Sequence, residues 1–425
     1  MTRIPDPQCA PADEEHPDLR RNFASLSLNV IFQRIGWIFK TESVIMPGFV
    51  ESLTPSGAIR GVLPLISRFG QSIPQLYAAH LVGPLARKKP VFLAFAFLQV
   101  IVWGVLALGL FLMPSSRSRG PLILFLVCYA VHWITYGVTG LLWGTLQGKL
   151  IPPRRRGRLL AVSSVIGCAG AIIAAYFLMT AWLPAGGERY DLIFAATASC
   201  FLIAVLAVTR LKERPVPGSN DVRFSGFLAD SIRAIRRDAN FRLFLVVVAL
   251  SYASMLVFPH YAVFGLRRLG LRPASFVSFV IAQNLVNALG SLFVGLFADR
   301  RGNRRALSFV SILLSSAPLM AIGIAQLPMA IARPCYTLVF ACIGFSPVRM
   351  RIVSNYALEI TSSDRHPQYL SILNIVQSSL VLFSPLVGLA IDRLSFEFVF
   401  VVCSGIMAVG AGLTFRLVEP REGRA

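Results

Sequence analysis

Charged residues are scarce in this sequence, and acidic residues are the scarcest. Only 14% of the 425 residues are charged, and Asp and Glu together number 20. A soluble protein of this length needs more charge to cover its surface. The mean hydropathy of +0.67 agrees with this. The low charge excludes an ordinary soluble domain and indicates a polytopic membrane protein.

Several chemical motifs are also missing. The sequence has no G-x-x-x-x-G-K phosphate loop and no H-E-x-x-H helix, and its seven Cys form no C-x-x-C pair. These absences argue against ATP-driven transport, against a zinc hydrolase, and against metal or disulfide roles for the Cys. No pair of acids with a nearby base marks a catalytic site at a membrane face. We expect no enzyme activity, no metal and no cofactor.

Long apolar runs fill the rest of the chain. They show no alternation with a period of two residues, so they predict membrane-spanning helices rather than barrel strands. The sequence predicts an all-α polytopic membrane protein with twelve spans. These lie near residues 27–50, 60–83, 91–113, 121–148, 159–183, 190–210, 241–264, 274–297, 306–328, 334–357, 369–391 and 397–416.

The formal charge of +21 has a particular distribution. If the N-terminus is cytoplasmic, most Lys and Arg fall in cytoplasmic tails and loops, such as Arg87-Lys88-Lys89 and Arg154-Arg155-Arg156. This positive-inside bias predicts a protein of the cell (inner) membrane with both termini cytoplasmic, and it disfavours a nucleic-acid partner. The N-terminal tail lacks the basic start and short apolar core of a cleavable signal, so we expect the first span to be retained.

The longest polar stretch separates spans six and seven and divides the chain into halves. Its second part places Phe227 and Ile232 on one helical face and Arg233 and Arg236 on the other. This pattern predicts an interfacial helix held by anionic lipids at the inner surface. The predicted units are a tail (1–26), a six-helix bundle (27–210), the linker (211–240), a second six-helix bundle (241–416) and a tail (417–425).

The two halves resemble each other. A shift of 212 residues places Gln71 on Gln283 and Gln75 on Asn287. Coincident polar residues in otherwise apolar helices suggest a duplication, which is the usual construction of two-bundle transporters.

Ionisable residues inside the spans are candidates for a solute site, because each costs about 2.5–3.5 kcal/mol to insert unless it faces a wet cavity or a partner. Nearly all are basic, which favours an anionic solute; pairing within the protein or extension to an interface is the alternative. Lys40 lies about 120° around the helix from Arg34 and could extend in this way. The ionisable residues are Arg34, Lys40, Glu42, Arg68, Arg349 and Arg351.

Three spans carry a row of polar side chains on one helical face. Amides both donate and accept hydrogen bonds, so such rows can bind a polar solute, or they can simply join neighbouring helices. The rows are Arg68, Gln71, Ser72 and Gln75 in span two; Gln283, Asn284, Asn287 and Ser291 in span eight; and Asn374, Gln377 and Ser378 in span eleven.

Coupling of transport to protons needs a titratable group within the spans. Glu42 is the one acid deep in a span, although Arg34 could neutralise it as a structural pair. His132 is a second candidate, although a His among aromatic residues is more often a packed donor. Pro47, Pro64, Pro74, Pro259, Pro318, Pro347 and Pro385 also fall within spans and predict bends there.

One basic loop links spans eight and nine with almost no connecting residues. It reads Gly295-Leu-Phe-Ala-Asp299-Arg300-Arg-Gly302-Asn-Arg304-Arg305. It resembles the loop signature G-x-x-x-D-R-x-G-x-R-R of the major facilitator superfamily (MFS). Weaker resemblances are Ile151-Pro-Pro before Arg156-Gly-Arg158, and Ser384-Pro385 before Asp392-Arg393.

The resemblance covers nearly the whole chain and implies two six-helix bundles that rock to expose a central site alternately to each side of the membrane. Two departures separate the chain from the drug:proton antiporters of that superfamily: span four has no mid-helix Arg and span five has no Gly-Pro pair. The subgroup is therefore not assigned.

The ends of repeat-related spans carry charges of opposite sign. Arg87 and Lys149 end spans two and four, whereas Asp299 and Glu359 stand at or near the corresponding places of the second half. We predict that these charges attract across the cytoplasmic mouth and stabilise an outward-open state. Exposed pairs contribute only about 0–1 kcal/mol each, so several must act together.

The sequence thus favours a secondary transporter of a small organic solute, with an anion preferred. We expect coupling to protons or another ion, and a monomer as the working unit. The alternative is a transporter-like sensor or scaffold that binds a solute without moving it.

Overall fold

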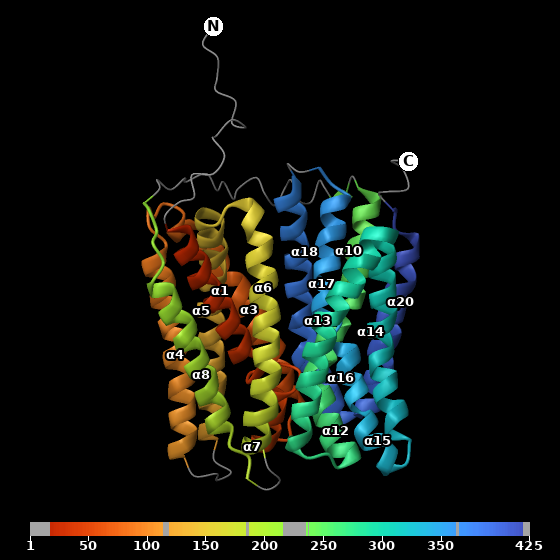
Figure 1. Cartoon of the computed structure of the whole chain (residues 1–425). Helices are drawn as coiled ribbons and strands as arrows, with labels where there is room; N and C mark the ends of the chain where they lie inside the picture. The colour runs from red at the N-terminus through yellow and green to blue at the C-terminus, as the bar shows by residue number, and fades with distance from the viewer. Residues whose placement is uncertain are drawn as a thin grey trace.

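The computed structural model describes residues 18–113, 119–183, 187–215, 235–236, 238–362 and 365–419. The described residues form helices joined by short connections, with no strand among them. The predicted all-α fold is confirmed. The helices stand side by side in two groups, and residues 18 and 419 lie at the same end of the molecule (Figure 1). We call this end the terminal face and the opposite end the far face.

The first half packs as one group, in which α4 lies against α5 and α8, and α1 lies against α6 and α8. Its helices are α1 (Leu19–Ile38), α2 (Ile45–Leu53), α3 (Gly57–Val82), α4 (Lys89–Leu112), α5 (Gly120–Leu150), α6 (Pro153–Ala174), η1 (Ala175–Met179), α7 (Thr180–Trp182) and α8 (Tyr190–Thr209).

The second half forms the other group, in which α14 and α10 lie against α20. Its helices are α10 (Ala239–Ser251), α11 (Ala253–Val257), η2 (Phe258–His260), α12 (Tyr261–Leu269), η3 (Pro273–Ser275), α13 (Phe276–Arg301), α14 (Asn303–Ala325), α15 (Met329–Cys335), α16 (Thr337–Ile343), α17 (Ser346–Glu359), α18 (His366–Leu380), η5 (Val381–Phe383), α19 (Ser384–Arg393), α20 (Phe396–Leu413) and η6 (Thr414–Arg416).

Ten helical stretches among the described residues are long and apolar enough to cross a membrane. They correspond to the third to twelfth predicted spans. The first two predicted spans are helical but fall outside this set, because α1 carries Asn29, Gln33 and Arg34, and α3 carries Arg60, Arg68 and several amides. The interfacial helix expected in the linker lies almost wholly outside the described residues.

Proline accounts for several breaks within the spans, because it cannot donate the helical hydrogen bond and its ring clashes with the preceding turn. Pro259 lies in the short η2 segment, and Pro347 and Pro385 stand in the first turns of α17 and α19. The spanning helix is interrupted at each of these three residues. Pro64 and Pro74 lie inside the continuous helix α3, and Pro318 lies inside α14.

The halves meet most extensively where α3 crosses α19 near the far face. Gly57 and Gly61 of α3 face Ser384 and Gly388 of α19, so each helix presents small residues four apart. Small residues let two helix backbones approach closely inside a membrane. A Cβ added at Gly388 would lie 2.0 Å from the Gly57 carbonyl oxygen. Gly57, Gly61 and Gly388 therefore have no room for a larger side chain.

We predict that Gly388→Ala destabilises the protein in detergent by about 1–3 kcal/mol, as overpacking of a tight contact does. The measurement is the thermal unfolding midpoint of the purified protein. Gly405→Ala is the matched control, because its added Cβ would meet no atom within 4 Å. Equal midpoints for the two variants would contradict the close approach of α3 and α19.

Candidate functional site

A cavity of about 640 Å³, lined by both apolar and polar side chains, lies between the two halves. This volume suits a small organic molecule. The first half contributes α1, the α1–α2 connection, α3, α4, α5 and α6, and the second half contributes α11, η2, α13 and α17. The polar and ionisable lining residues are Asn29, Gln33, Arg34, Thr41, Glu42, Ser43, Arg68, Gln99, Tyr136, Thr139, Gln283, Asn284, Asn287 and Ser346.

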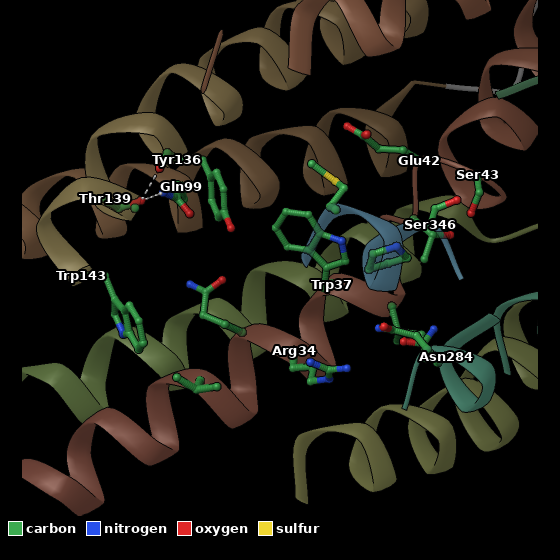
Figure 2. A pocket seen from close by; sticks show the side chains of 18 of the residues that line it. Arg34, Trp37, Glu42, Ser43, Gln99, Tyr136, Thr139, Trp143, Asn284 and Ser346 are labelled. Atoms are coloured by element: carbon green, nitrogen blue, oxygen red, sulfur yellow. Dashed lines mark hydrogen bonds between the residues drawn. The ribbon is translucent and has the colours of Figure 1, made fainter. Parts of the chain in front are cut away.

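The cavity extends from the middle of the molecule towards the terminal face. Glu42 and Ser43 line one end of it, in the connection that follows α1, and Trp143 lies at the other end (Figure 2). Phe92, in the first turn of α4, also lines the end nearer the terminal face. The lining thus reaches the turns next to the terminal face but not the far face.

Two arginines give the wall contributed by the first half its charge. Arg34 and Arg68 both line the cavity, and the buried Nε atom of each has no hydrogen-bond partner. A buried guanidinium N–H without a partner is costly, and a carboxylate or phosphate oxygen can accept from it. These atoms are therefore the strongest anion-recognition feature of the wall.

The second half adds two further arginines in α17. Arg351 donates from Nη2 to Asn287 Oδ1 at 3.0 Å and to Ser291 Oγ at 2.5 Å, and it lies within electrostatic range of Arg34. Arg349 is 4% exposed, donates to Ser254 Oγ at 3.1 Å, and lies within electrostatic range of Arg68. Arginines of the first half therefore lie near arginines of the second half.

The structure brings five of the predicted solute-site residues together at the cavity wall: Arg34, Glu42, Arg68, Asn284 and Asn287. The residues predicted for the same site that do not line the cavity are Gln71, Gln75, His132, Arg349, Asn374 and Gln377. The rows on spans two and eleven instead meet each other, with Ser72 Oγ and Ser378 Oγ 3.2 Å apart. At this contact the two rows join α3 of the first half to α18 of the second half.

His132 is buried within the first half, behind the cavity wall. It is 0% exposed, and its Nδ1 accepts a 3.1 Å hydrogen bond from Trp103 Nε1. Its ring contacts the rings of Trp103, Trp133, Tyr136 and Phe201. His132 therefore has the packing role that the sequence left open as its alternative.

The sequence did not identify several polar lining residues. Gln99 donates to Thr139 Oγ1 at 2.8 Å, and its buried Oε1 has no partner (Figure 2). Gln33 precedes Arg34 on α1 and also lines the cavity. A single amide in the apolar run of α4 was the available signal for Gln99.

The far face is closed by charged contacts between the halves. Glu51 of α2 accepts from Arg267 Nε of α12 at 2.6 Å and also pairs with the buried Arg60 of α3. Asp392 of α19 accepts from the Gly57 backbone N–H at 2.7 Å and the Ala58 N–H at 3.2 Å. A carboxylate from one half thus caps the first turn of a helix in the other, where the helix dipole favours negative charge.

Lys149 is one of the residues predicted to gate the other end, and it pairs with an acid outside that predicted set. Lys149 Nζ contacts Glu213 Oε1 of its own half at 2.8 Å, and Asp299 and Arg87 are exposed. Burial raises the pKa of Glu213, but hydrogen bonds from Lys149 and from the Lys88 and Lys89 backbone outweigh it and lower the pKa overall. The attraction predicted for Asp299 and Glu359 concerns the opposite conformation and stays a prediction.

The basic loop connects α13 to α14 through Gly302 alone. Gly302 has a φ of +88°, a conformation that residues with a Cβ rarely adopt. A Cβ there would also lie 2.5 Å from the Glu419 carboxylate, which pairs with Arg304. Gly295 and Arg300 belong to the last turns of α13, so the loop motif spans a helix end, one glycine and a helix start.

A polar cavity between two helical groups, sealed at one end by contacts between them, defines a two-bundle membrane transporter that works by alternating access. A family model described as Major Facilitator Superfamily matches residues 35–357 and 275–425, and the chain belongs to this superfamily. The resemblance carried by the basic loop is confirmed.

Solved structures agree on the fold. A mutant of the nucleoside transporter NupG is 14% identical with a TM-score of 0.70, covering 94% of this chain and 100% of that chain. A D-xylose-proton symporter is 16% identical with a TM-score of 0.67, covering 93% and 98%. A bacterial homologue of the iron transporter ferroportin, in an inward-facing state, is 13% identical with a TM-score of 0.67, covering 94% and 99%. A search of curated proteins found no match.

We predict that Asp392→Asn speeds hydrogen exchange of the Gly57 and Ala58 amides by about tenfold or more, because it weakens charge-assisted hydrogen bonds that hold the far face closed. Exchange mass spectrometry of the peptide over 54–60 measures this. Asp191→Asn is the control, because Asp191 pairs with Arg189 inside the first half. Unchanged exchange in Asp392→Asn would refute the capping role.

Proposed function

We propose that this protein is a secondary active transporter that moves a small organic anion across the membrane by alternating access. The observation that carries the proposal is the pair Arg34 and Arg68 at the cavity wall, each with a buried N–H that lacks a partner. An anion entering the cavity supplies both the missing acceptors and a counter-charge. A cation would meet repulsion from the same residues.

The geometry of the wall supports a solute with more than one polar group. Asn284 and Asn287 lie across from the first-half arginines, and Gln33 and Gln99 lie further along the cavity. Tyr136, Trp37 and Trp143 add aromatic surface to the lining (Figure 2). We infer a carboxylate or phosphate ester whose apolar or hydroxylated body rests on these rings and amides.

We assign the terminal face to the cytoplasm, since the basic clusters at Arg87–Lys89, Arg154–Arg156 and Arg300–Arg305 all lie there. The conformation is then inward-facing, with its cavity directed to the cytoplasm and its outer side closed by Glu51 and Asp392. The further proposals are residence in the inner membrane, anionic lipid at the cytoplasmic surface, and a monomer as the working unit.

We predict that anions stabilise the protein and that cations of similar size do not. The probes are succinate, glucuronate and glucose 6-phosphate, compared with putrescine, choline and glucose in a thermal-shift assay. Arg34→Gln and Arg68→Gln should each weaken binding of the stabilising anion by about tenfold or more, because each removes a desolvated charged donor.

Arg416→Gln is the matched control for this binding experiment. Arg416 is an exposed arginine at the terminal face, away from the cavity, and its loss should leave the binding curve unchanged. Stabilisation by cations alone, or anion binding that survives both cavity substitutions, would overturn the anionic assignment.

Transport itself is tested in proteoliposomes with the anion that binds most tightly. We predict accumulation of the labelled anion inside vesicles, loss of uptake in Arg34→Gln, and a higher rate under an imposed pH gradient. Binding without uptake, by protein inserted in either orientation, would instead identify a sensor or scaffold.

A further inference from the structure

Lys40 occupies an unusual place for a lysine. It lies in the non-helical connection Phe39–Val44 between α1 and α2, halfway along the first span, and is 1% exposed. The extension towards an interface that the sequence allowed is therefore wrong, because the side chain points into the first half. Its Nζ is buried and has no hydrogen-bond partner.

Three tryptophans surround the amine. Nζ lies 3.3 Å from the ring centroid of Trp37, 4.9 Å from that of Trp133 and 5.9 Å from that of Trp103. The faces of indole rings attract a cation, and they do so more strongly when water is excluded. The rings thus favour the ammonium, whereas burial without a hydrogen-bond acceptor favours the neutral amine. These opposed preferences make the proton state of Lys40 sensitive to nearby charge.

The polar groups around the amine offer one counter-charge. Glu42, two residues further along the same connection, attracts Lys40 and accepts a 2.5 Å hydrogen bond from Tyr129 of α5. His132, also on α5, repels a charged Lys40 when it is itself protonated. Its Nδ1 is occupied by the Trp103 N–H, so Lys40 gains no acceptor there.

Among the residues that the structure describes, the remaining neighbouring elements contribute no further acid. Tyr136 lies on α5 beside Trp37 and Trp133 and feels the charges of Arg68 of α3 and of Glu42. Arg34 lies on α1 itself. The aromatic side chains Phe194 and Phe201 of α8 close the cluster through their contacts with Trp103 and His132. At Lys40, the attraction of Glu42 therefore opposes the cost of burying the ammonium.

The connection to the cavity runs through Glu42. Glu42 and Trp37 line the cavity (Figure 2). Lys40 is not among the lining residues, and its Nζ lies over the Trp37 ring. The Glu42 carboxylate therefore stands between cavity water and the amine, which it attracts without a hydrogen bond in this conformation. Broken spanning helices of this kind hold coupling ions in other transporters.

We propose that Lys40 is the proton-binding site coupled to the solute: it takes up one proton when an anion occupies the cavity and releases it when the anion leaves. The inference rests on the proposed anion transport. The negative charge of an anion in the cavity, beyond Glu42 and Trp37, stabilises the ammonium, and by reciprocity the ammonium strengthens anion binding. One anionic charge and one proton would then cross together.

The proton step is tested without any solute. The purified full chain in lipid nanodiscs is titrated from about pH 9 to pH 5, a range in which buried lysines can change charge, while tryptophan emission is recorded. Three of the five tryptophans lie around Nζ, so their emission should report the charge of the amine. We expect one transition in the wild type, with the shape of a single-proton titration. Lys40→Arg keeps a permanent cation among the rings and should abolish the transition, as should Lys40→Met.

The controls separate Lys40 from its neighbours. His132→Gln and Lys212→Met should retain the transition, and Glu42→Gln should move its midpoint to lower pH because the counter-charge is lost. Lys40→Arg remains informative if Lys40→Met fails to fold. A transition that persists in Lys40→Arg, that disappears in His132→Gln, or that is absent from the wild type would overturn the assignment.

Coupling is tested by measuring binding of succinate and of glucose 6-phosphate across the same pH range. For the anion that binds, we expect affinity to rise by up to about tenfold for each pH unit below pH 9 until the midpoint is reached, and to stay level in Lys40→Arg. A wild-type affinity that does not change through the emission transition would overturn the coupling. If neither anion binds while Lys40→Arg still abolishes the transition, the anion proposal fails and the proton site stands.

Discussion

An excess of positive charge inside an apolar bundle is the constraint on which the rest of this structure depends. Arg34, Arg68 and Arg349 lie in or beside the membrane interior with too few acids to neutralise them. A charge withdrawn from water needs a partner, a wet surface or a polarisable ring. The cavity meets part of this need, because Arg34 and Arg68 both open onto it.

The two ends of the molecule use their charges in different ways. At the far face, Glu51 and Asp392 each reach into the opposite half, so the halves are held together there. At the terminal face, Lys149 contacts Glu213 within its own half, and the cavity opens between the halves. Closure of one end and opening of the other belong to the same rocking arrangement. The close crossing of α3 and α19 at Gly57 and Gly388 is part of the contact that closes the far face.

Part of the cavity lining was predictable from the chemistry of single residues within the spans. Arginine inside a span is costly, and this alone pointed to Arg34 and Arg68. Asn284 and Asn287 followed from a row of amides on one helical face. The same argument failed for Gln71 and Gln75, because a polar row shows which face of a helix is special but not which neighbour it meets. Their row on α3 meets α18 at Ser72 and Ser378 instead of the cavity.

The amino-acid pattern alone was enough for most of the helices, their approximate bounds and the superfamily loop, because hydropathy and turn chemistry act over short stretches of chain. Only the folded structure revealed three features: the tryptophans around Lys40, the cap that Asp392 places on α3, and the closed far face. Each joins residues from separate helices, and their meeting depends on how those helices tilt and cross. Lys40 is the clearest example. Its position in the first span could be read from the sequence, but its burial among Trp37, Trp103 and Trp133 results from the packing of three helices.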